Sequence, residues 1–450
     1  MNDLLEDTAL RAAGYLLGVG ERSVWPSAEA LGRLGELGGR MPDGPTSDAY
    51  VIALLDEIGS PATVASAGGR YFGFVIGGSL PATLAANWLA GAWDQDAGLV
   101  ALSPAAAAIE ETALRWLVDV LGLPPGTGAG FVTGATMANF TALAAARHAV
   151  LAKAGWDVES QGLFGAPYVT VIVGDEVHVS LLKALTMLGF GRERVTRVTV
   201  DDQGRMRAGA LPAITGPTIV CIQAGNVNTG AFDPAEQICQ AAHDAGAWVH
   251  VDGAFGLWAA AAPARAHLVG GFEQADSWAL DAHKWLNVPY DSGVAFCRNP
   301  EHLEAAMSVS AAYLTQSDTR EPDNYTPEMS RRARGVEIWA ALRSMGRSGL
   351  ADLVERCCRH ATRFAEGLSE AGYEILNQVE LNQVLLSFGD ADTTRRVIAA
   401  IQADGTCWCG GTVWQGKTAM RISVSSWATT EEDVDRSLEA MLRIAERIKG

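Results

Sequence analysis

One lysine, Lys284, stands where an apolar run ends, in the segment 280–286 with His283 before it and Trp285 after it. We expect the apolar run to be a buried strand that delivers the amine of Lys284 to a turn. Because a lysine is costly to bury, one kept in such a place is often a nucleophile that forms an imine with a carbonyl compound. A solvated charge at the end of a strand is the alternative.

A turn of small residues, Gly134, Ala135 and Thr136, lies between a short strand and an alanine-rich helix in the segment 130–139. Small side chains let backbone N–H groups and the Thr136 hydroxyl approach a phosphate at the helix N-terminus, where the helix dipole favours an anion. The pattern is neither a P-loop nor a GxGxxG fingerprint, which argues against nucleotide binding. An ordinary turn with a helix cap is the alternative.

A carboxylate, Asp252, ends the apolar run 247–251, and Ala254 follows it two residues later. In α/β folds, ligands bind at the carboxyl ends of parallel strands. An acid in that place can face a pyridine nitrogen and hold it protonated, and the small Ala254 could lie against a flat ring. For Asp252 too, a cap or a turn is the alternative.

A histidine, His178, follows another strand-like run and begins another helix. Its imidazole could stack on an aromatic cofactor and contact a substrate carboxylate, although lone histidines are more often structural. The order of these features carries the argument, because the phosphate turn, His178, Asp252 and Lys284 each follow a predicted strand of one sheet. An amine, an acid for a ring nitrogen and a phosphate turn together indicate pyridoxal 5′-phosphate.

The sheet that would position these residues is visible as short β-branched runs that alternate with longer amphipathic runs between residues 128 and 300. We expect buried strands of a mostly parallel sheet with helices on both faces, an α/β fold. The predicted strands are 168–173, 194–200, 218–223, 248–251, 277–280 and 293–297. One helix is well marked, because Pro234 stands in its first turn and Gly246 follows its end at Ala245.

The pattern changes after residue 336 to a long helix, short alternating segments and a terminal helix, which is typical of an α+β domain. The first 70 residues hold amphipathic helices without a sheet, and such an arm needs something to pack on, for which a second subunit is suited. The sequence therefore predicts an N-terminal helical arm at 1–70, a large cofactor-binding domain at 71–335 and a small C-terminal domain at 336–450.

The composition of the chain argues for a large protein with a buried core and against several kinds of partner. The chain has 450 residues, of which 48% are hydrophobic, enough for a large core and more than one domain usually holds. The net charge of -18 argues against nucleic acid or an anionic membrane as a partner. Seven cysteines without paired metal-ligand spacing indicate reduced thiols in the cytoplasm and no metal site. The acidic segment 1–7 does not read as a secretory signal, and the uncharged stretch 75–93, broken by Pro and Gly, reads as a buried helix near an interface and not as a membrane span.

The chain resembles the group II pyridoxal-phosphate decarboxylases, the family of the aromatic-amino-acid, glutamate, histidine and diaminobutyrate decarboxylases. The resemblance is strongest at 249–252 and 281–286, and it extends from Arg70 and the segment 103–104 to 421–424. It implies an aspartate-aminotransferase-like fold with a smaller α+β C-terminal domain. It also implies a homodimer whose active sites lie between the subunits.

The same resemblance implies a role for each candidate residue. Lys284 would carry the cofactor as an aldimine, Asp252 would pair with the pyridine nitrogen and His178 would stack on the ring. The expected phosphate and supporting residues are Gly134, Ala135, Thr136, Asp281 and His283, with Ala254 against the ring and Asn226 in the place where the family often has Gly-Thr-Thr.

Tyr325 is matched to a mobile loop that, in family members acting on aromatic amino acids, supplies a proton donor to the partner subunit. An exposed loop aromatic is the alternative. Three nearby arginines, Arg331, Arg332 and Arg334, read best as subunit-interface or surface pairs. The resemblance places the substrate pocket at Phe74, Val75, Trp93 and Leu102, whose apolar character favours an aromatic or other hydrophobic substrate. The carboxylates Asp94 and Asp96 could instead favour a basic side chain.

The expected reaction is decarboxylation of an L-amino acid, a small-molecule substrate, to an amine and CO2. An aminotransferase, a carbon–carbon lyase or an aldehyde synthase would share every cofactor residue, because these enzymes differ in which α-carbon bond is aligned and how the carbanion is quenched. A catalytically silent dimer fits poorly with the presence of Lys284, Asp252 and His178.

Overall fold

The computed structural model describes residues 1–309 and 320–449 and divides into two compact units. The large unit consists of Ser79–Arg359 and Asn377–Gln383. The small unit consists of Met1–Gly78, His360–Leu376 and the chain from Val384 onward. These units group the residues differently from the three predicted domains, because the structure clusters the N-terminal segment with the C-terminal one and divides a long helix between the units. The three-domain division therefore stays a prediction.

The large unit is built on a seven-stranded sheet in the order β1-β7-β6-β5-β4-β2-β3. Its strands are β1 (Gly128–Val132), β2 (Thr170–Gly174), β3 (Thr196–Val198), β4 (Thr218–Gln223), β5 (Trp248–Asp252), β6 (Ser277–Asp281) and β7 (Gly293–Cys297). Every residue of β1, β4, β5, β6 and β7 is buried, as the continuous apolar runs predict for a sheet covered on both faces. The predicted α/β class and the predicted strands are confirmed.

The direction of one strand departs from the parallel pattern. Strands β2, β3, β4, β5 and β6 pair in parallel, whereas β7 runs antiparallel to both β6 and β1. Since β1 and β6 are each antiparallel to β7, they point the same way. The carboxyl ends of all strands except β7 therefore lie at one edge of the sheet.

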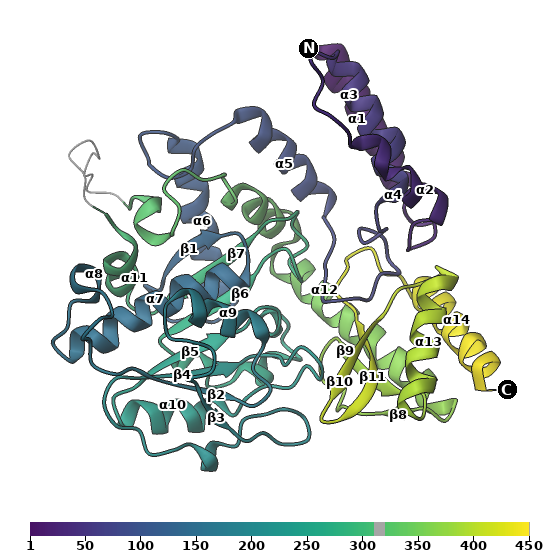
Figure 1. Ribbon diagram of the computed structural model, residues 1–450. Helices are drawn as coiled ribbons and strands as arrows, with labels where there is room; N and C mark the ends of the chain where they lie inside the picture. Colours follow the sequence, from purple (N-terminus) through teal and green to yellow (C-terminus); the bar gives the residue numbers. More distant parts are fainter. Residues whose placement is uncertain (310–319, 450) are drawn as a thin grey trace. The chain divides into compact units, whose positions relative to one another are not determined.

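The chain of the large unit also forms helices, some beside this sheet and some beyond it (Figure 1). They are α5 (Pro81–Trp93), α6 (Pro104–Val120), α7 (Ala135–Lys153), α8 (Val158–Gln161), α9 (Val179–Met187), α10 (Ala235–Asp244), α11 (Pro300–Met307) and α12 (Gly335–Glu370), with short 3-10 helices including η3 (Ala208–Ala210), η4 (Gly256–Ala261), η5 (Ala266–Val269), η6 (Phe272–Gln274) and η7 (Pro322–Tyr325). Helix α10 matches the predicted helix. Helix α12 is interrupted at Gly346, whose φ of 60° and ψ of -174° are not helical.

The alanine-rich sequence of α7 explains how the helix packs. Ala138 and Ala142 are fully buried and contact Val132, Ala279 and Ala295 of three different strands. Because these side chains are small, the helix backbone lies close to β1, β7 and β6. The first turn of α7 is thereby fixed against the carboxyl ends of the strands.

The small unit holds a four-stranded sheet in the order β10-β11-β9-β8. Its strands are β8 (Glu374–Ile375), β9 (Gln383–Ser387), β10 (Gly410–Trp414) and β11 (Lys417–Ser423), and its helices are α1 (Asn2–Gly18), α2 (Ala28–Arg33), α3 (Asp48–Leu54), α4 (Ser60–Ala62), α13 (Ala391–Asp404) and α14 (Glu431–Lys449), with η1 (Leu34–Leu37) and η2 (Leu55–Gly59). The α+β character predicted for the C-terminal part is confirmed.

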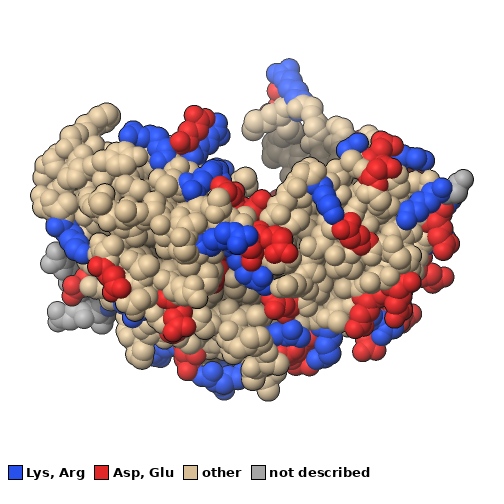
Figure 2. Space-filling model, turned by 90° about the horizontal axis from the view of Figure 1, so that it is seen from below, with Lys and Arg blue, Asp and Glu red and all other residues tan. Residues whose placement is uncertain are grey.

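Several features bear on the class of protein. Within residues 1–309 and 320–449, no helix is both long and apolar enough to cross a membrane. The same described residues contain no cluster of His, Cys, Asp and Glu that could hold a metal ion. All seven cysteines are buried, and none of them is in a disulfide. On the face drawn in Figure 2, acidic and basic side chains are interspersed.

Candidate active site

The predicted cofactor residues of the large unit gather at the edge where the parallel strands end. Asp252 is the last residue of β5 and Asp281 is the last residue of β6. The turn at Gly134 follows β1, Asn226 follows β4 and His178 follows β2. The sequence predicted that these residues follow strands of one sheet, and in the structure they do.

Asp281 connects Lys284 to the start of α7. One carboxylate oxygen of Asp281, Oδ2, lies 2.8 Å from Nζ of Lys284. The other oxygen, Oδ1, accepts the backbone N–H of Ala135, the first residue of α7. The structure therefore brings the lysine and the small-residue turn together through a single side chain.

Two glycines allow the turn before α7 to approach its neighbours. A Cβ on Gly134 would lie 3.0 Å from Cε1 of His283, and a Cβ on Gly293 would lie 2.5 Å from Cα of Gly134. Gly134 is also the N-cap of α7, and its position supplies no side-chain cap to the helix. The first turn of α7 thus presents backbone N–H groups to a narrow space with little side-chain bulk, as an anion site requires.

His283 is held in one orientation beside Asp281. Its Nδ1 accepts the backbone N–H of Ser292 at 3.2 Å, so the neutral ring carries its proton on Nε2, 3.5 Å from Oδ1 of Asp281. Burial lowers the pKa of His283, which favours this neutral form. The ring also packs on Tyr290, with centroids 4.3 Å apart, a contact that sequence reasoning missed because Tyr290 belongs to no recognisable motif.

Asp252 is buried and accepts two hydrogen bonds from the protein. Nδ2 of Asn139 donates to Oδ2 at 3.3 Å, and the backbone N–H of Ala254 donates to Oδ1 at 3.3 Å. Sequence reasoning also missed Asn139. The signal for it was a single amide on the otherwise apolar, buried face of the alanine-rich helix that begins at the phosphate turn.

Asn226 carries a polar group that the described part of the chain does not satisfy. Its side-chain oxygen accepts the backbone N–H groups of Asn228 at 2.9 Å and Thr229 at 3.3 Å. Its amide nitrogen is buried and has no hydrogen-bond partner among the described residues. A buried donor left unpaired costs about 1–3 kcal/mol, so this amide is suited to a group that comes from outside the chain.

His178 is the N-cap of α9, and its Nδ1 lies 2.7 Å from Oγ of Ser180. A structural role was the alternative that the sequence left open for this histidine, and the contact that caps α9 is such a role. It does not test stacking on a cofactor, which stays a prediction.

Tyr325 lies elsewhere in the large unit. It ends η7, and its ring lies 4.4 Å from the guanidinium carbon of Arg320. Burial is the main cause that raises the pKa of this phenol. Together with Thr127 and Gly128, at the start of β1, it lines a groove of about 640 Å³. Within one chain, Tyr325 thus lies by the beginning of β1, whereas the turn at Gly134 follows its end.

The four residues predicted for the substrate pocket divide between the units. Trp93 and Leu102 belong to the large unit and are 45% and 52% exposed. Phe74 and Val75 belong to the small unit, where Phe74 stacks on Trp408 with ring centroids 5.7 Å apart. Phe74 and Val75 have positive φ values of 60° and 74°, a conformation that is strained in residues with side chains and is often kept at functional sites. The pocket itself stays a prediction.

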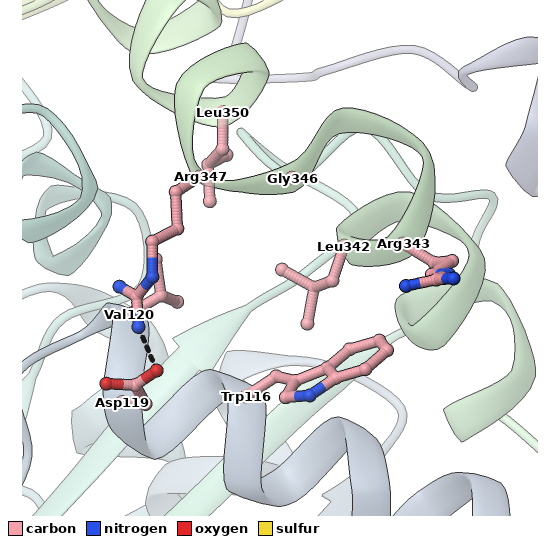
Figure 3. Close-up of a pocket in the computed structure, with 8 residues that line it drawn as sticks. All are labelled: Trp116, Asp119, Val120, Leu342, Arg343, Gly346, Arg347 and Leu350. Carbon is pink, nitrogen blue, oxygen red and sulfur yellow. Dashed lines mark hydrogen bonds and ion pairs between the residues drawn. The ribbon is translucent and has the colours of Figure 1, made fainter.

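A separate pocket of about 330 Å³ lies between α6 and α12 (Figure 3). Trp116 and Leu342 form its apolar wall, and Arg347 pairs with Asp119 across it. None of the sequence-predicted site residues lines this pocket. The candidate site is therefore the group around Lys284 and Asp281, where a nucleophilic amine, a buried acid and a helix N-terminus meet.

The fold of the whole chain is that of pyridoxal-phosphate decarboxylases. A crystal structure of Oryza sativa TDC with PLP and tryptamine superposes with a TM-score of 0.91 at 21% identity and covers 100% of this chain and 98% of the other. A crystal structure of mouse CSAD in apo form gives a TM-score of 0.90 at 20% identity, over 99% and 98% of the two chains. At these identities the match concerns the fold, and the predicted aspartate-aminotransferase-like architecture is confirmed.

The chain belongs to the pyridoxal-dependent decarboxylase family, because the model of the family's conserved domain matches residues 65–389. It is 28% identical to an aromatic-L-amino-acid decarboxylase of Bacillus atrophaeus over 76% of this chain and 72% of the relative. It is 29% identical to an L-2,4-diaminobutyrate decarboxylase of Rhizobium meliloti (strain 1021), over 81% and 74%. The protein is a carboxy-lyase that depends on pyridoxal 5′-phosphate.

The residues at the candidate site fit this cofactor. The aldehyde requires an amine, which Lys284 supplies, and the phosphate requires N–H donors, which the first turn of α7 supplies. The unpartnered amide of Asn226 adds a donor for which the described chain offers no acceptor. The buried carboxylate of Asp252 suits a protonated ring nitrogen.

Proposed function

We propose that this enzyme decarboxylates an L-amino acid with an aromatic or other hydrophobic side chain, and that the group around Lys284 and Asp281 is its active site. The observation that carries the proposal is the Asp281 carboxylate, which contacts Nζ of Lys284 through one oxygen and the N–H of Ala135 through the other. When bound, the cofactor draws electrons from the α-carbon, so that the bond to the carboxylate can break and CO2 can leave.

In this proposal each residue of the site binds or orients one part of the cofactor. Lys284 binds its aldehyde carbon, and Asp252 holds the pyridine nitrogen protonated. Gly134, Ala135 and Thr136 line the proposed phosphate site, where the phosphate accepts from the Thr136 hydroxyl and from the N–H groups of this turn that Asp281 does not occupy. The remaining proposed contacts are Asn226, which donates its free amide hydrogens, His178 and Ala254, which lie against the ring, and His283, which supports the phosphate side.

Asp281 has a second proposed task, which concerns a proton. An amine must lose its extra proton before it can attack a carbonyl carbon. Oδ2 of Asp281 lies 2.8 Å from Nζ of Lys284, so it is placed to accept that proton without any movement of the backbone. The N–H of Ala135 fixes the other oxygen and keeps Oδ2 aimed at the amine.

For the substrate, the proposal rests on apolar residues and on relatives. Phe74, Val75, Trp93 and Leu102 are the proposed pocket residues, and the relatives include an aromatic-L-amino-acid decarboxylase and a tryptophan decarboxylase 1 of Oryza sativa subsp. japonica, 27% identical over 88% of this chain. Tyr325 is the proposed donor of the proton that the α-carbon receives after CO2 leaves, supplied by one subunit to the site of the other.

An aldehyde synthase is the second candidate function, because a relative that is 28% identical over 74% of this chain is named phenylacetaldehyde synthase, of a Rosa hybrid cultivar. The cofactor residues are common to both reactions, so the products must decide between them.

We also propose a cytoplasmic homodimer. The arm helices of the small unit expose large apolar side chains that an isolated chain would leave in water: Leu5, Leu10, Leu16, Leu17, Leu31, Leu34, Leu37, Tyr50, Val51 and Leu55. Exposed apolar side chains in such number mark an interaction surface. Seven buried cysteines, none of them in a disulfide, suit a reducing compartment.

The test combines one substitution with a panel of substrates. The wild-type enzyme, loaded with pyridoxal phosphate, is treated with borohydride to fix any imine, and Lys284→Ala is treated in parallel. Lys183→Ala, which removes an exposed lysine of α9, is the matched control. We expect wild type and the control to retain the cofactor covalently and to release CO2 from an aromatic amino acid, and Lys284→Ala to do neither.

Retention of covalent cofactor by Lys284→Ala would overturn the assignment of the active site. The panel covers the common amino acids, ornithine and diaminobutyrate, and amine, aldehyde, keto acid and CO2 are measured together. Release of CO2 with amine from basic or acidic substrates alone would contradict the proposed substrate class. Aldehyde in place of amine would replace decarboxylation with the second candidate function.

A further inference from the structure

A chain of hydrogen bonds runs through the core of the large unit and ends on Asp252. Trp248, His250 and Asp252 alternate along β5, so their side chains lie on the same face of the sheet. Ser277 is the register partner of His250 on the neighbouring strand β6. Asn139, on α7, lies over this face and contacts both His250 and Asp252.

Each link of the chain is buried, and every link except the last is 2.9 Å or shorter. Nε1 of Trp248 donates to Oγ of Ser277 at 2.9 Å, and Oγ of Ser277 lies 2.9 Å from Nδ1 of His250. Nε2 of His250 lies 2.7 Å from Oδ1 of Asn139, whose Nδ2 donates to Oδ2 of Asp252 at 3.3 Å. Ser277, His250 and Asn139 are completely buried, so water does not compete for these bonds.

The chemistry of the two ends fixes the direction of the chain. An indole N–H can only donate, and a carboxylate can only accept. With Nδ2 of Asn139 facing Asp252, its oxygen faces His250, so Nε2 of His250 must carry the proton and Nδ1 must accept from Ser277. Every hydrogen therefore points toward Asp252. In the reverse direction, Oγ of Ser277 would receive two donors and its own hydrogen would have no acceptor in the chain.

His250 transmits orientation rather than charge. Burial lowers the pKa of His250 to about 3, so the ring stays neutral near neutral pH. A neutral ring with one donor and one acceptor nitrogen is what the direction of the chain requires. A charged ring would have two donor nitrogens, and one of them would face the hydroxyl hydrogen of Ser277.

We propose that Asn139 and His250 are positioning residues that aim the Asp252 carboxylate at the pyridine nitrogen of the cofactor and so keep that nitrogen protonated. The inference rests on the proposed role of Asp252 and adds residues that the sequence motifs did not include. Residues that orient the ligands of a metal in a comparable way change metal affinity or activity by about 10–100-fold when they are removed, and we expect an effect of that order here.

The variant Asn139→Leu tests the proposal, because leucine has nearly the shape of asparagine and makes neither hydrogen bond. Thr141→Val is the matched control: Thr141 is a buried residue of the same helix, and its hydroxyl has no partner among the described residues. Ser277→Ala is a second variant, which breaks the chain at the far side of His250 and serves if Asn139→Leu does not fold. Asp252→Asn reports on the proposed function itself.

Each holoenzyme is prepared with pyridoxal phosphate labelled with 15N in the ring, and the 15N chemical shift reports protonation of the ring nitrogen. Cofactor affinity and the thermal unfolding midpoint are measured beside it. We expect Asn139→Leu and Ser277→Ala to move the shift toward the unprotonated value, in the direction of Asp252→Asn, and Asn139→Leu to weaken cofactor binding by about tenfold or more. Thr141→Val should match wild type.

The outcomes distinguish the role of the hydrogen-bond chain from the proposed role of Asp252. If Asp252→Asn moves the shift but Asn139→Leu and Ser277→Ala keep the wild-type shift, the chain is only structural and the inference is wrong, while the proposed function stands. If Asp252→Asn itself leaves the shift unchanged, the role of Asp252 fails and the inference fails with it. A lower unfolding midpoint without a change in the shift counts against the inference, because a merely structural contact would give that result.

Discussion

Replacing Glu110 by Gln should loosen one region of the large unit far more than a neighbouring replacement on the same helix. Glu110 lies on α6 with its side chain 1% exposed, and Nη2 of Arg331, also 1% exposed, contacts both of its oxygens at 2.9 and 2.7 Å. Arg320 adds a contact at 3.2 Å. One buried carboxylate thus balances two guanidinium groups.

The magnitude follows from burial. Removal of one partner from a buried ion pair leaves the other charge without compensation, at a cost of about 3–5 kcal/mol. Here the cost falls on Arg331, whose Nε and Nη1 already lack partners among the described residues. Gln keeps the shape of Glu and one acceptor, so we expect the lower part of this range, about 3 kcal/mol, which is roughly a hundredfold in an equilibrium constant.

The matched control is Glu111→Gln, one residue further along α6. Glu111 pairs with Arg115 at 3.4 Å, but the two side chains are 56% and 65% exposed. Exposed pairs are worth about 1 kcal/mol or less. The control therefore makes the same substitution on the same helix, and it should hardly change the stability of this region.

Native-state hydrogen exchange is the suitable assay, because it reports opening of one region and does not require the two units to unfold together. Backbone amides of β1 and of residues 320–334 should exchange roughly a hundredfold faster in Glu110→Gln than in wild type. Rates within about threefold of those in Glu111→Gln would refute the reasoning, because they would mean that less than about 1 kcal/mol depends on the buried charge.

Two further predictions concern the site edge and pH. In Gly293→Ala, the new Cβ would lie 2.5 Å from Cα of Gly134, so we expect a loss of about 1–3 kcal/mol in the free energy of unfolding and weaker cofactor binding. Gly209→Ala is the control, because its new Cβ meets nothing within 4 Å, and it should bind the cofactor like wild type. Equal affinities of the two variants in a cofactor titration would contradict this prediction. A hydrogen bond to Asp276 raises the pKa of His243, so its stabilising contribution is present below the ordinary value of about 6.5 and is lost as pH rises through the folded-state pKa. His243→Gln should thus lower the thermal midpoint at about pH 6 and have less effect at about pH 9, and a difference that stays constant with pH would be evidence against this.

The sequence predicted the sheet well because its strands are buried on both faces. The runs at 218–223 and 293–297 match β4 and β7 in full, since a continuous apolar run has few other structures open to it. Lys284, Asp252 and the turn at Gly134 were found for the same reason, because each is a chemically distinct residue that follows such a run.

What the sequence could not give was contact between elements. Asn139 and Tyr290 have no motif, and their importance follows only from what they touch, Asp252 in one case and His283 in the other. Likewise the grouping of the N-terminal helices with the C-terminal sheet in one unit depends on packing that no local pattern reports.

The direction of β7 explains why Gly293, which the sequence indicated only as the first residue of a strand, belongs to the site. A run of apolar residues does not tell whether its strand is parallel or antiparallel to its neighbours. Because β7 is antiparallel to both β1 and β6, it begins at the edge where those strands end, and Gly293 is the register partner of Val132 on one side and Asp281 on the other. A parallel β7 would have placed its first residue at the opposite edge.

In the observed direction, Gly293 separates the turn before α7 from Asp281, the acid that contacts Lys284. Because Gly293 has no side chain, Asp281 can reach across it to the N–H of Ala135. The close contact between the phosphate turn and the lysine therefore depends on the one strand that breaks the parallel pattern.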